Sequence, residues 1–324
     1  MNNKVEDLLR PLFYFIKDVI DFNGKRRLSR NIELYNRHTG NRGFLLCTGE
    51  SLEHINILQL KKEYTFGINL FFCHEDFIEL DLSYYVFLDT DRNLYPGMPQ
   101  WPKNYLGELG QNPMRQIYFE LDKRINTTTQ LILNSECFKY TKDLFLDNIV
   151  FFSKVKKDLK VVNGVSAKTI ADMTKRCLSG GGSIYFTILI MIYMGFKQIY
   201  LIGAGYSYSP EYLLHFYDNI ILPMSIGKDE AELKIKEVIF THNRKYNGSL
   251  EYYGLLEKNN YYRGISISKK NENNPKHYAE HRKIKKYAES IGVKIVNIIP
   301  AGFESPVYEK ISWDIVANEV LQKK

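Results

Sequence analysis

The sequence predicts an α/β protein with a mostly parallel, doubly wound sheet that is flanked by helices. Short apolar runs recur along the chain, and glycine or small polar residues follow several of them. Helical patterns lie between these runs, in the alternation that parallel strands require. A polar, Tyr-rich stretch at 209–276 interrupts the alternation and is too long for a plain connection. We therefore expect one α/β core with an inserted lid subdomain.

This pattern divides the chain into four parts. Residues 1–42 would form an N-terminal helical extension, because apolar residues repeat at helical spacing over Val5–Phe22. Residues 43–208 would form the core, 209–276 the lid, and 277–324 a helix–strand–helix unit that completes the core. The first helix would pack on the core, although the basic run that follows it would also suit an anionic membrane surface.

Each apolar run in the core is expected to be a buried strand. The expected strands are Gly43–Cys47, Tyr64–Asn69, Tyr84–Leu88, Gln116–Leu121, Thr129–Leu133, Ile149–Phe152, Gln198–Ile202 and Val293–Ile299. The expected helices are Leu52–Leu60, Ile184–Met194, Asp229–Val238 and Tyr278–Ser290. Gly195 would end the second of these, because glycine readily adopts the left-handed conformation found at helix ends. Ligands of such sheets bind beyond the carboxyl ends of the strands, so residues that follow a strand are the candidates for a site.

Composition and charge indicate a globular protein with an anionic ligand. Hydrophobic residues make up 44% of the chain and charged residues 25%, which excludes a disordered or collagen-like protein. The net charge is +7, and residues 1–43 and 263–286 carry local surpluses of +4 and +6. Two basic segments beside a mildly acidic body suit an anionic ligand or an anionic membrane surface. No nucleic-acid recognition motif accompanies them, so a nucleic-acid partner is not expected.

The cysteines and the apolar runs indicate a cytoplasmic protein with reduced thiols. Cys47, Cys73, Cys137 and Cys177 stand far apart, without the spacing of a metal site. The first residues do not read as a signal peptide. The longest apolar run, Ile184–Phe196, is shorter than the roughly 18 residues of a membrane span. Peripheral contact with the inner membrane stays an open alternative, and the oligomeric state is not predicted.

Two glycine-containing turns are candidates for ligand binding. Thr48, Gly49 and Ser51 lie between the first strand and its helix, where backbone N–H groups can hold a phosphate. Ser51 would serve equally well as the N-cap of that helix. The turn Ser179–Ser183 holds three consecutive glycines at a helix entry, which allows close approach of an anionic or ring-shaped ligand. A simple loop is the alternative for this second turn.

Paired carboxylates follow the third expected strand. Asp89 and Asp91 have the DxD spacing in which two carboxylates hold a divalent cation that bridges phosphates. A structural or sugar-contacting Asp89 is the alternative, because DxD is a short and common pattern.

Two histidines stand four residues apart at the start of an expected helix. His277 and His281 would lie on one helix face, with Glu280 beside the second. The order differs from that of the HExxH zinc motif and no third ligand is evident, so a metal site is not expected. A single histidine that acts as a general base is the better functional interpretation, and a solvated histidine is its alternative.

These blocks resemble, in the same order, those of the MptE-like family. The matching blocks are Cys47–Leu52, Phe66–Asn69, Ser179–Ser183, Gly195–Gly203, Tyr206–Tyr208 and Pro300–Gly302. The family is named after an archaeal 6-hydroxymethylpterin diphosphokinase and includes the flagellin motility accessory factors. The same framework resembles the bacterial lipooligosaccharide sialyltransferases, whose HYxxH run corresponds to His277–His281. The resemblance covers roughly residues 43–305 and is most specific at Gly195–Gly203.

The resemblance implies a Rossmann-like nucleotide-binding core and an inverting sialyltransferase-like enzyme. It would transfer a CMP-activated acidic sugar to a glycan or glycoprotein without a metal or other cofactor, in lipopolysaccharide or flagellin glycosylation. CMP would lie over Thr48, Gly49, Ser51, Asn69 and Ser183, with Asp89, Gly181 and Gly182 as further candidate contacts. Tyr206, Tyr208 and Tyr278 would hydrogen-bond the leaving phosphate, and His281 would be the general base.

Two alternatives to this function stay open. The family has Gly-Asn where this chain has Cys47-Thr48, and Asp where it has Gly205. A non-catalytic member that binds a sugar or a partner protein is therefore compatible with the same blocks. A pterin-type diphosphokinase would instead use ATP and Mg²⁺, with Asp89 and Asp91 as metal ligands.

Overall fold

The computed structural model describes residues 27–69, 71–88, 121–141 except 123, 148–156, 172–179, 182–204 and 267–322 except 302 and 304. The expected helices at Val5–Phe22 and Asp229–Val238 lie outside these residues. Residues 1–26 of the N-terminal extension and 209–266 of the lid lie outside them as well, so both parts of the organisation stay predictions.

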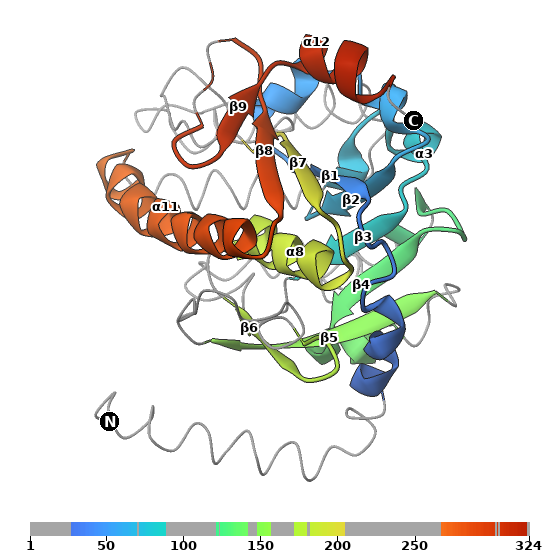
Figure 1. Ribbon diagram of the computed structural model, residues 1–324. Helices are drawn as coiled ribbons and strands as arrows, with labels where there is room; N and C mark the ends of the chain where they lie inside the picture. Colours follow the sequence, from blue (N-terminus) through green and yellow to red (C-terminus); the bar gives the residue numbers. More distant parts are fainter. Residues whose placement is uncertain are drawn as a thin grey trace, which may run out of the picture.

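Nine strands of the described chain form one sheet in which every pairing is parallel. They are β1 (Arg42–Leu46), β2 (Tyr64–Ile68), β3 (Tyr84–Phe87), β4 (Gln130–Asn134), β5 (Ile149–Lys156), β6 (Arg176–Ser179), β7 (Gln198–Ile202), β8 (Lys294–Ile298) and β9 (Glu309–Ile311). Their order across the sheet is β6-β5-β4-β3-β2-β1-β7-β8-β9 (Figure 1). The expected α/β fold with a parallel, helix-flanked sheet is confirmed.

Strand β1 lies where the order of the sheet reverses. The chain places β2 to β6 on one side of β1 and β7 to β9 on the other. In this register Leu45 of β1 lies between Phe66 of β2 and Leu201 of β7. Doubly wound sheets bind their ligands beyond the carboxyl ends of the strands at such a switch point. The loops after β1, β2 and β7 are therefore where this fold would place a site.

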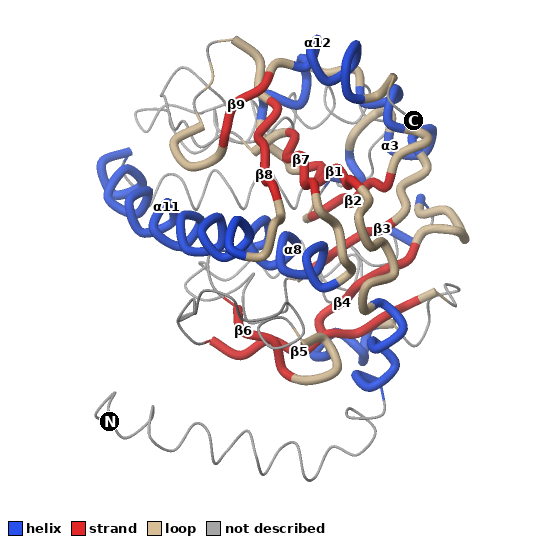
Figure 2. The backbone as a smooth tube through the Cα atoms, in the orientation of Figure 1, coloured by secondary structure: helices blue, strands red, loops and turns tan. Residues whose placement is uncertain are grey.

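Helices cover both faces of the sheet (Figures 1 and 2). α8 (Gly182–Tyr193), α11 (Ile267–Ser290) and the short segment that holds Leu34 pack on the face that carries Leu45, and the other short segments pack on the face that carries Leu46. The shorter segments of the chain are η1 (Arg30–Leu34), η2 (Glu50–His54), η3 (Ile57–Leu60), η4 (Phe71–Cys73), α3 (Phe77–Leu80), η5 (Ser135–Tyr140), α12 (Trp313–Ile315) and η6 (Val316–Val320). No helix within the described ranges is long and apolar enough to cross a membrane.

The all-apolar helix α8 ends at the expected glycine. Gly195 has a φ of 93°, and a Cβ there would come within 3.0 Å of the Cα of Thr39. The turn at 36–40 closes over this helix end, where the His38 N–H donates to the Met194 carbonyl at 2.7 Å. Only glycine combines this positive φ with so close an approach of a second backbone segment.

The expected helix at Leu52–Leu60 is wrong, because this segment forms the two separate 3₁₀ turns η2 and η3. Ile55 between them has extended backbone, with φ −127° and ψ 126°. The Asn56 side chain then accepts a hydrogen bond from the Leu58 N–H at 3.2 Å. An asparagine that caps the following turn in this way competes with a continuous helix, which explains the interruption.

Two other expected boundaries need correction. Leu121 is helical, because its carbonyl accepts a hydrogen bond from the Ile125 N–H at 2.8 Å, so a strand at Gln116–Leu121 is wrong at this residue. The other residues of that expected strand lie outside the described chain. Helix α11 begins at Ile267 instead of Tyr278, so residues 267–276 belong to the helix, and the expected lid boundary stays a prediction.

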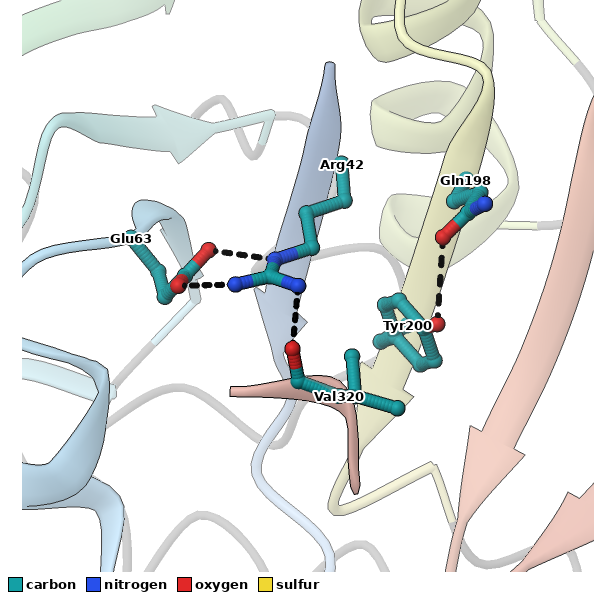
Figure 3. Close-up of polar contacts among 5 residues, drawn as sticks. All are labelled: Arg42, Glu63, Gln198, Tyr200 and Val320. Atoms are coloured by element: carbon teal, nitrogen blue, oxygen red, sulfur yellow. Dashed lines mark hydrogen bonds and ion pairs between the residues drawn. The ribbon is translucent and has the colours of Figure 1, made fainter. Parts of the chain in front are cut away.

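The amino edge of the sheet carries the contacts that hold the C-terminal segment. Arg42 begins β1 and makes a bidentate pair with Glu63, with Nε–Oε2 and Nη2–Oε1 distances of 2.9 and 2.7 Å (Figure 3). Its Nη1 donates to the carbonyl of Val320 in η6. Beside it, the Tyr200 hydroxyl donates to Oε1 of Gln198 at 3.2 Å. The bond between Arg42 and Val320 ties η6 to the start of the central strand.

Candidate functional site

The loops after β1 and β7 contact each other directly at the switch point. The Gly49 N–H donates to the Gly203 carbonyl at 2.8 Å, and the Cys47 N–H donates to the Ile202 carbonyl at 2.7 Å. Gly203 has a φ of +71°, and a Cβ there would lie 2.9 Å from the Cys47 carbonyl oxygen. The second loop therefore already occupies the Gly49 N–H, and phosphate binding by the other backbone groups of this turn stays a prediction.

Ser51 places an unsatisfied hydroxyl beneath this loop. Its side chain is 0% exposed, and its Oγ has no hydrogen-bond partner among the described residues. Gly49 is the N-cap of η2, so the alternative in which Ser51 caps the helix is wrong. Thr48 is buried beside it. A buried hydroxyl without a partner is costly and uncommon, which makes Ser51 a candidate contact for a ligand.

Asn69 follows β2 and places a second unsatisfied oxygen at the neighbouring strand end. Its φ of 53° is left-handed, and the Tyr85 hydroxyl fixes its backbone by donating to the Asn69 carbonyl at 2.5 Å. The side-chain Oδ1 is buried and has no partner in the part of the chain that the structure describes. Ser51 and Asn69 thus offer two unfilled acceptors after adjacent strands, where the resemblance assigns the nucleotide.

The glycine turn before α8 is described only at its end. Gly182 begins the helix with a φ of +85° and is exposed, while Ser183 is half-buried and its carbonyl accepts from the Thr187 hydroxyl at 2.8 Å. Gly181 lies outside the described residues. Gly182 has the left-handed conformation that would allow a ligand to approach the backbone closely. Ligand binding by the rest of this turn stays a prediction.

His281 lies in α11 and is almost fully buried, with 3% of its surface exposed. Its Nδ1 lies 2.8 Å from the hydroxyl of Tyr308, which directly precedes β9. The rings of Tyr185 and Tyr308 stand edge-on to the imidazole, with centroid distances of 6.2 and 5.8 Å. Tyr185 belongs to the first turn of α8, which starts just after β6, so this cluster lies toward the carboxyl edge of the sheet.

Burial keeps this cluster uncharged at neutral pH. Burial, together with the charge of His277, lowers the pKa of His281 to about 4. Burial also raises the pKa of Tyr308 far above its usual range, and it raises that of Tyr185 with help from the charge of Glu280. A neutral imidazole can accept a proton, so His281 has the protonation state that a general base needs.

The remaining expected catalytic and acidic residues are only partly described. Tyr278 is half-buried one turn before His281, and burial raises its pKa. Tyr206, Tyr208 and Asp89 lie outside the described residues. Within the described ranges, no group of three or more His, Cys, Asp or Glu side chains could hold a metal ion.

The basic surplus near His281 is partly neutralised. Lys283 pairs with Glu280 at 2.7 Å, and Lys285 donates to the Val307 carbonyl at 2.9 Å. Glu280 keeps a buried Oε2 without a hydrogen-bond partner among the described residues. The polar side of α11 therefore combines paired cations with an unsatisfied carboxylate oxygen next to the histidine.

Sequence reasoning missed three residues of this region: Tyr308, Tyr185 and Asn297. Asn297 is fully buried on β8, and its Nδ2 donates to the Ala204 carbonyl at 3.1 Å and to Ser305 Oγ at 3.2 Å. An asparagine inside the apolar run Val293–Ile299 was a usable signal, because buried polar groups need partners. The two tyrosines carried no such signal among the 24 of the chain.

The environment of Cys47 disfavours a nucleophilic role. It is buried in the first turn after β1, and burial raises the pKa of its thiol far above its ordinary value. Burial therefore disfavours the thiolate that nucleophilic attack requires.

Fold and site define a doubly wound, parallel α/β protein with candidate binding groups at its switch point. No family model and no curated protein sequence match the chain, so membership of the MptE-like family is not confirmed. Two solved structures of the Campylobacter jejuni sialyltransferase CstII, one with cytidine-5'-monophosphate and one with a trisaccharide acceptor and CMP, are similar with TM-scores of 0.30. Each has 13% identity over 64% of this chain and 78% of that chain.

A third solved structure belongs to the same group of enzymes. The apo alpha-2,3-sialyltransferase from Campylobacter jejuni has a TM-score of 0.27 and 16% identity over 64% of this chain and 72% of that chain. Similarity at this level does not assign a function, so the function has to be argued from the residues of the site.

Proposed function

We propose that this protein is an inverting, metal-independent glycosyltransferase that uses a CMP-activated acidic sugar as donor. Its acceptor would be a surface glycan or a flagellin-type glycoprotein. The observation that carries the proposal is the buried, neutral imidazole of His281, held by a hydroxyl near the carboxyl edge of a doubly wound sheet. Proton transfer to such an imidazole suits the deprotonation of an acceptor hydroxyl.

The donor would bind over the loops after β1 and β2. The buried Ser51 Oγ and Asn69 Oδ1 have no partners among the described residues and would accept hydrogen bonds from the nucleotide. Thr48, Gly49 and Ser183 would complete its contacts, with Asp89, Gly181 and Gly182 as further candidates. Because the Gly49 N–H is already bonded to Gly203, Gly49 would contribute close approach instead of a donor.

The transfer step would break one bond and form one bond at the anomeric carbon. The acceptor oxygen attacks this carbon from the face opposite the phosphate, and His281 takes its proton. The bond between the sugar and the phosphate breaks, its electron pair leaves with CMP, and the configuration inverts. Tyr278, Tyr206 and Tyr208 would donate hydrogen bonds to the departing phosphate, where charge increases in the transition state.

Donor binding would also raise the pKa of His281, the proposed general base. A pKa of about 4 makes His281 a weak base in the free protein, whereas a general base works best near the operating pH. The phosphate and carboxylate of a bound acidic donor would favour the imidazolium and raise this pKa. A donor with an uncharged sugar would raise the pKa of His281 less, which supports a donor with an acidic sugar.

A nucleotide panel tests the binding half of the proposal. We expect CMP at one hundred times its Kd to stabilise the protein by about 2.7 kcal/mol in thermal unfolding, and UDP, GDP and ADP to do less. Ser51→Ala and Asn69→Ala should weaken the CMP response. A response only to ATP with Mg²⁺ would favour the diphosphokinase instead, and no response to CMP would remove the main support for the transferase.

A substitution on α11 tests the catalytic half. His281→Ala should abolish the release of CMP from a CMP-activated acidic sugar in the presence of acceptor, while CMP binding remains. His277→Ala is the comparison on the same helix: His277 is exposed, so transfer should persist, and the loss of its charge should raise the pKa of His281. Sugar binding without any turnover by the unmodified protein would indicate the non-catalytic alternative.

A further inference from the structure

The contact between His281 and Tyr308 joins two segments that are far apart in sequence. The residues are 27 positions apart, one in α11 and the other just before β9, and the Nδ1–hydroxyl distance is 2.8 Å. Both side chains are almost fully buried. Because Nδ1 has the Tyr308 hydroxyl as its partner, the direction of this bond decides which ring nitrogen carries the proton.

We propose that Tyr308 is a positioning residue that accepts a hydrogen bond from Nδ1–H of His281 and thereby makes Nε2 the proton-accepting nitrogen. This inference rests on the proposed function, in which His281 is the general base. An imidazole accepts a proton through one nitrogen only if the other carries the hydrogen. The partner of Nδ1 therefore fixes both the tautomer and the direction in which the base points.

Tyr308 is itself held in place from two sides. Its carbonyl accepts from the Ser305 hydroxyl at 2.9 Å, and Ser305 Oγ accepts from Asn297 Nδ2 at 3.2 Å. Asn297 belongs to β8, so this chain of bonds anchors Tyr308 to the sheet. On the other side, Lys285 of α11 donates to the carbonyl of Val307 at 2.9 Å. The tyrosine is thus fixed relative to both the sheet and the helix that carries the histidine.

The neighbouring rings restrain the plane of the imidazole. Tyr185 and Tyr308 stand at interplanar angles of 85° and 90° to it. Rotation of the imidazole about its own axis would break both edge-on contacts as well as the bond to Tyr308. A ring that is held in plane and in tautomer is preorganised for proton transfer in one direction.

Nitrogen NMR reads the tautomer without any turnover. The protein has seven histidines, and the ring signals of His281 can be assigned by their loss in His281→Gln. We expect ring ¹⁵N shifts of a protonated Nδ1 and an unprotonated Nε2 in the ¹⁵N-histidine-labelled protein. In Tyr308→Phe we expect a mixture of tautomers. An unprotonated Nδ1 in the original protein would overturn the proposal, because Tyr308 would then be the donor.

Kinetics test the consequence of the tautomer. Tyr308→Phe should lower kcat by about 10-fold to 100-fold with the donor KM nearly unchanged, because a neutral hydroxyl orients less strongly than the triad carboxylate, whose loss costs about 10⁴. Two matched Tyr→Phe controls should keep kcat. Tyr287 on α11 is buried with no partner for its hydroxyl among the described residues, and Tyr84 binds a different histidine.

The outcomes separate this inference from the proposed function. A normal kcat in Tyr308→Phe, together with an inactive His281→Ala, would overturn the positioning role and leave the transferase standing. An unmodified protein that transfers no sugar would overturn the transferase, and the NMR experiment would still decide which nitrogen carries the proton. Loss of kcat in all three Tyr→Phe variants would show a general packing effect and would also overturn the positioning role.

Discussion

Two buried histidine–tyrosine pairs occupy opposite edges of the same sheet. At the amino edge, Nε2 of His38 lies 2.6 Å from the hydroxyl of Tyr84. Toward the carboxyl edge, Nδ1 of His281 lies 2.8 Å from the hydroxyl of Tyr308. Burial lowers the pKa of both histidines to about 4, with an additional effect of Arg37 on the first and of His277 on the second.

The surroundings of the two pairs differ. His38 packs against the rings of Tyr64 and Phe196, at centroid distances of 4.1 and 4.8 Å, and its turn closes the end of α8. Around His281, Tyr185 and Glu280 have buried oxygens without partners among the described residues. A lowered pKa by itself therefore does not mark a functional site. Unsatisfied polar groups nearby are the feature that distinguishes the second pair.

Lowering the pH should destabilise the protein through both histidine–tyrosine pairs, and this is the largest loss of stability that we expect. The unfolded histidines take up a proton near pH 6.5, but the folded ones do so only near pH 4, so the unfolded state binds more protons between these values. The contribution of the histidines to stability should therefore be constant above about pH 7.5 and fall as the pH drops from 6.5 to 4, by about 3 kcal/mol for each histidine. Urea unfolding at several pH values measures this loss.

Ligand and variant controls separate the two contributions. His38→Gln should remove the contribution of His38 to the pH dependence of stability, whether or not CMP is bound. Saturating CMP should reduce the contribution of His281, because an anion near this imidazole raises its pKa. If CMP changes the pH dependence equally in the unmodified protein and in His281→Gln, the two pairs do not differ in the expected way.

Removing the amino-edge histidine should cost stability without affecting binding. His38→Ala leaves a cavity among aromatic rings and an unpaired Tyr84 hydroxyl, so we expect a loss of about 2 to 4 kcal/mol. Denaturant unfolding measures the loss, and calorimetric titration below the unfolding range should give an unchanged Kd for CMP. A weakened Kd would contradict a purely structural role for this pair.

Truncation of Asn297 should give a smaller loss near the second pair. Asn297→Ala removes the donors to the Ala204 carbonyl and to Ser305, so we expect a loss of about 1 to 3 kcal/mol. The kcat should fall as well, because Tyr308 loses an anchor. Asn126→Ala is a suitable control, since its exposed side chain donates to Asp81 in a surface turn. Equal stability losses in both variants would contradict the anchoring role.

Most of the fold could be predicted because it depends on local patterns. The apolar runs that became β1 to β5, β7 and β8 are short and buried on both faces, and Gly195 ended α8 at the expected residue. β6 and β9 were missed because Arg176–Ser179 and Glu309–Ile311 are short and hold no apolar run. Leu52–Leu60 was misjudged because helical spacing does not reveal the capping asparagine in its middle.

The candidate site was proposed in part from local patterns and in part from the family resemblance. Ser51 was proposed from the glycine-containing turn after the first strand and Asn69 from the family resemblance, and the roles of both stay predictions. His281 was found by its spacing from His277. Its partner Tyr308 was not, since nothing local relates two residues that meet only when a helix packs beside the strand connection.

The sequence by itself determined the class of fold, the ends of several elements and the residue types that could carry chemistry. These follow from periodicity, turn residues and apolar runs, which act within a few positions of each other. The tertiary structure alone decided which of the histidines in the described ranges is buried beside an unsatisfied polar cluster and which one only supports a helix end. Burial and hydrogen-bond partners depend on segments that the chain brings together across tens of residues, and these set the charge and direction of a titratable group.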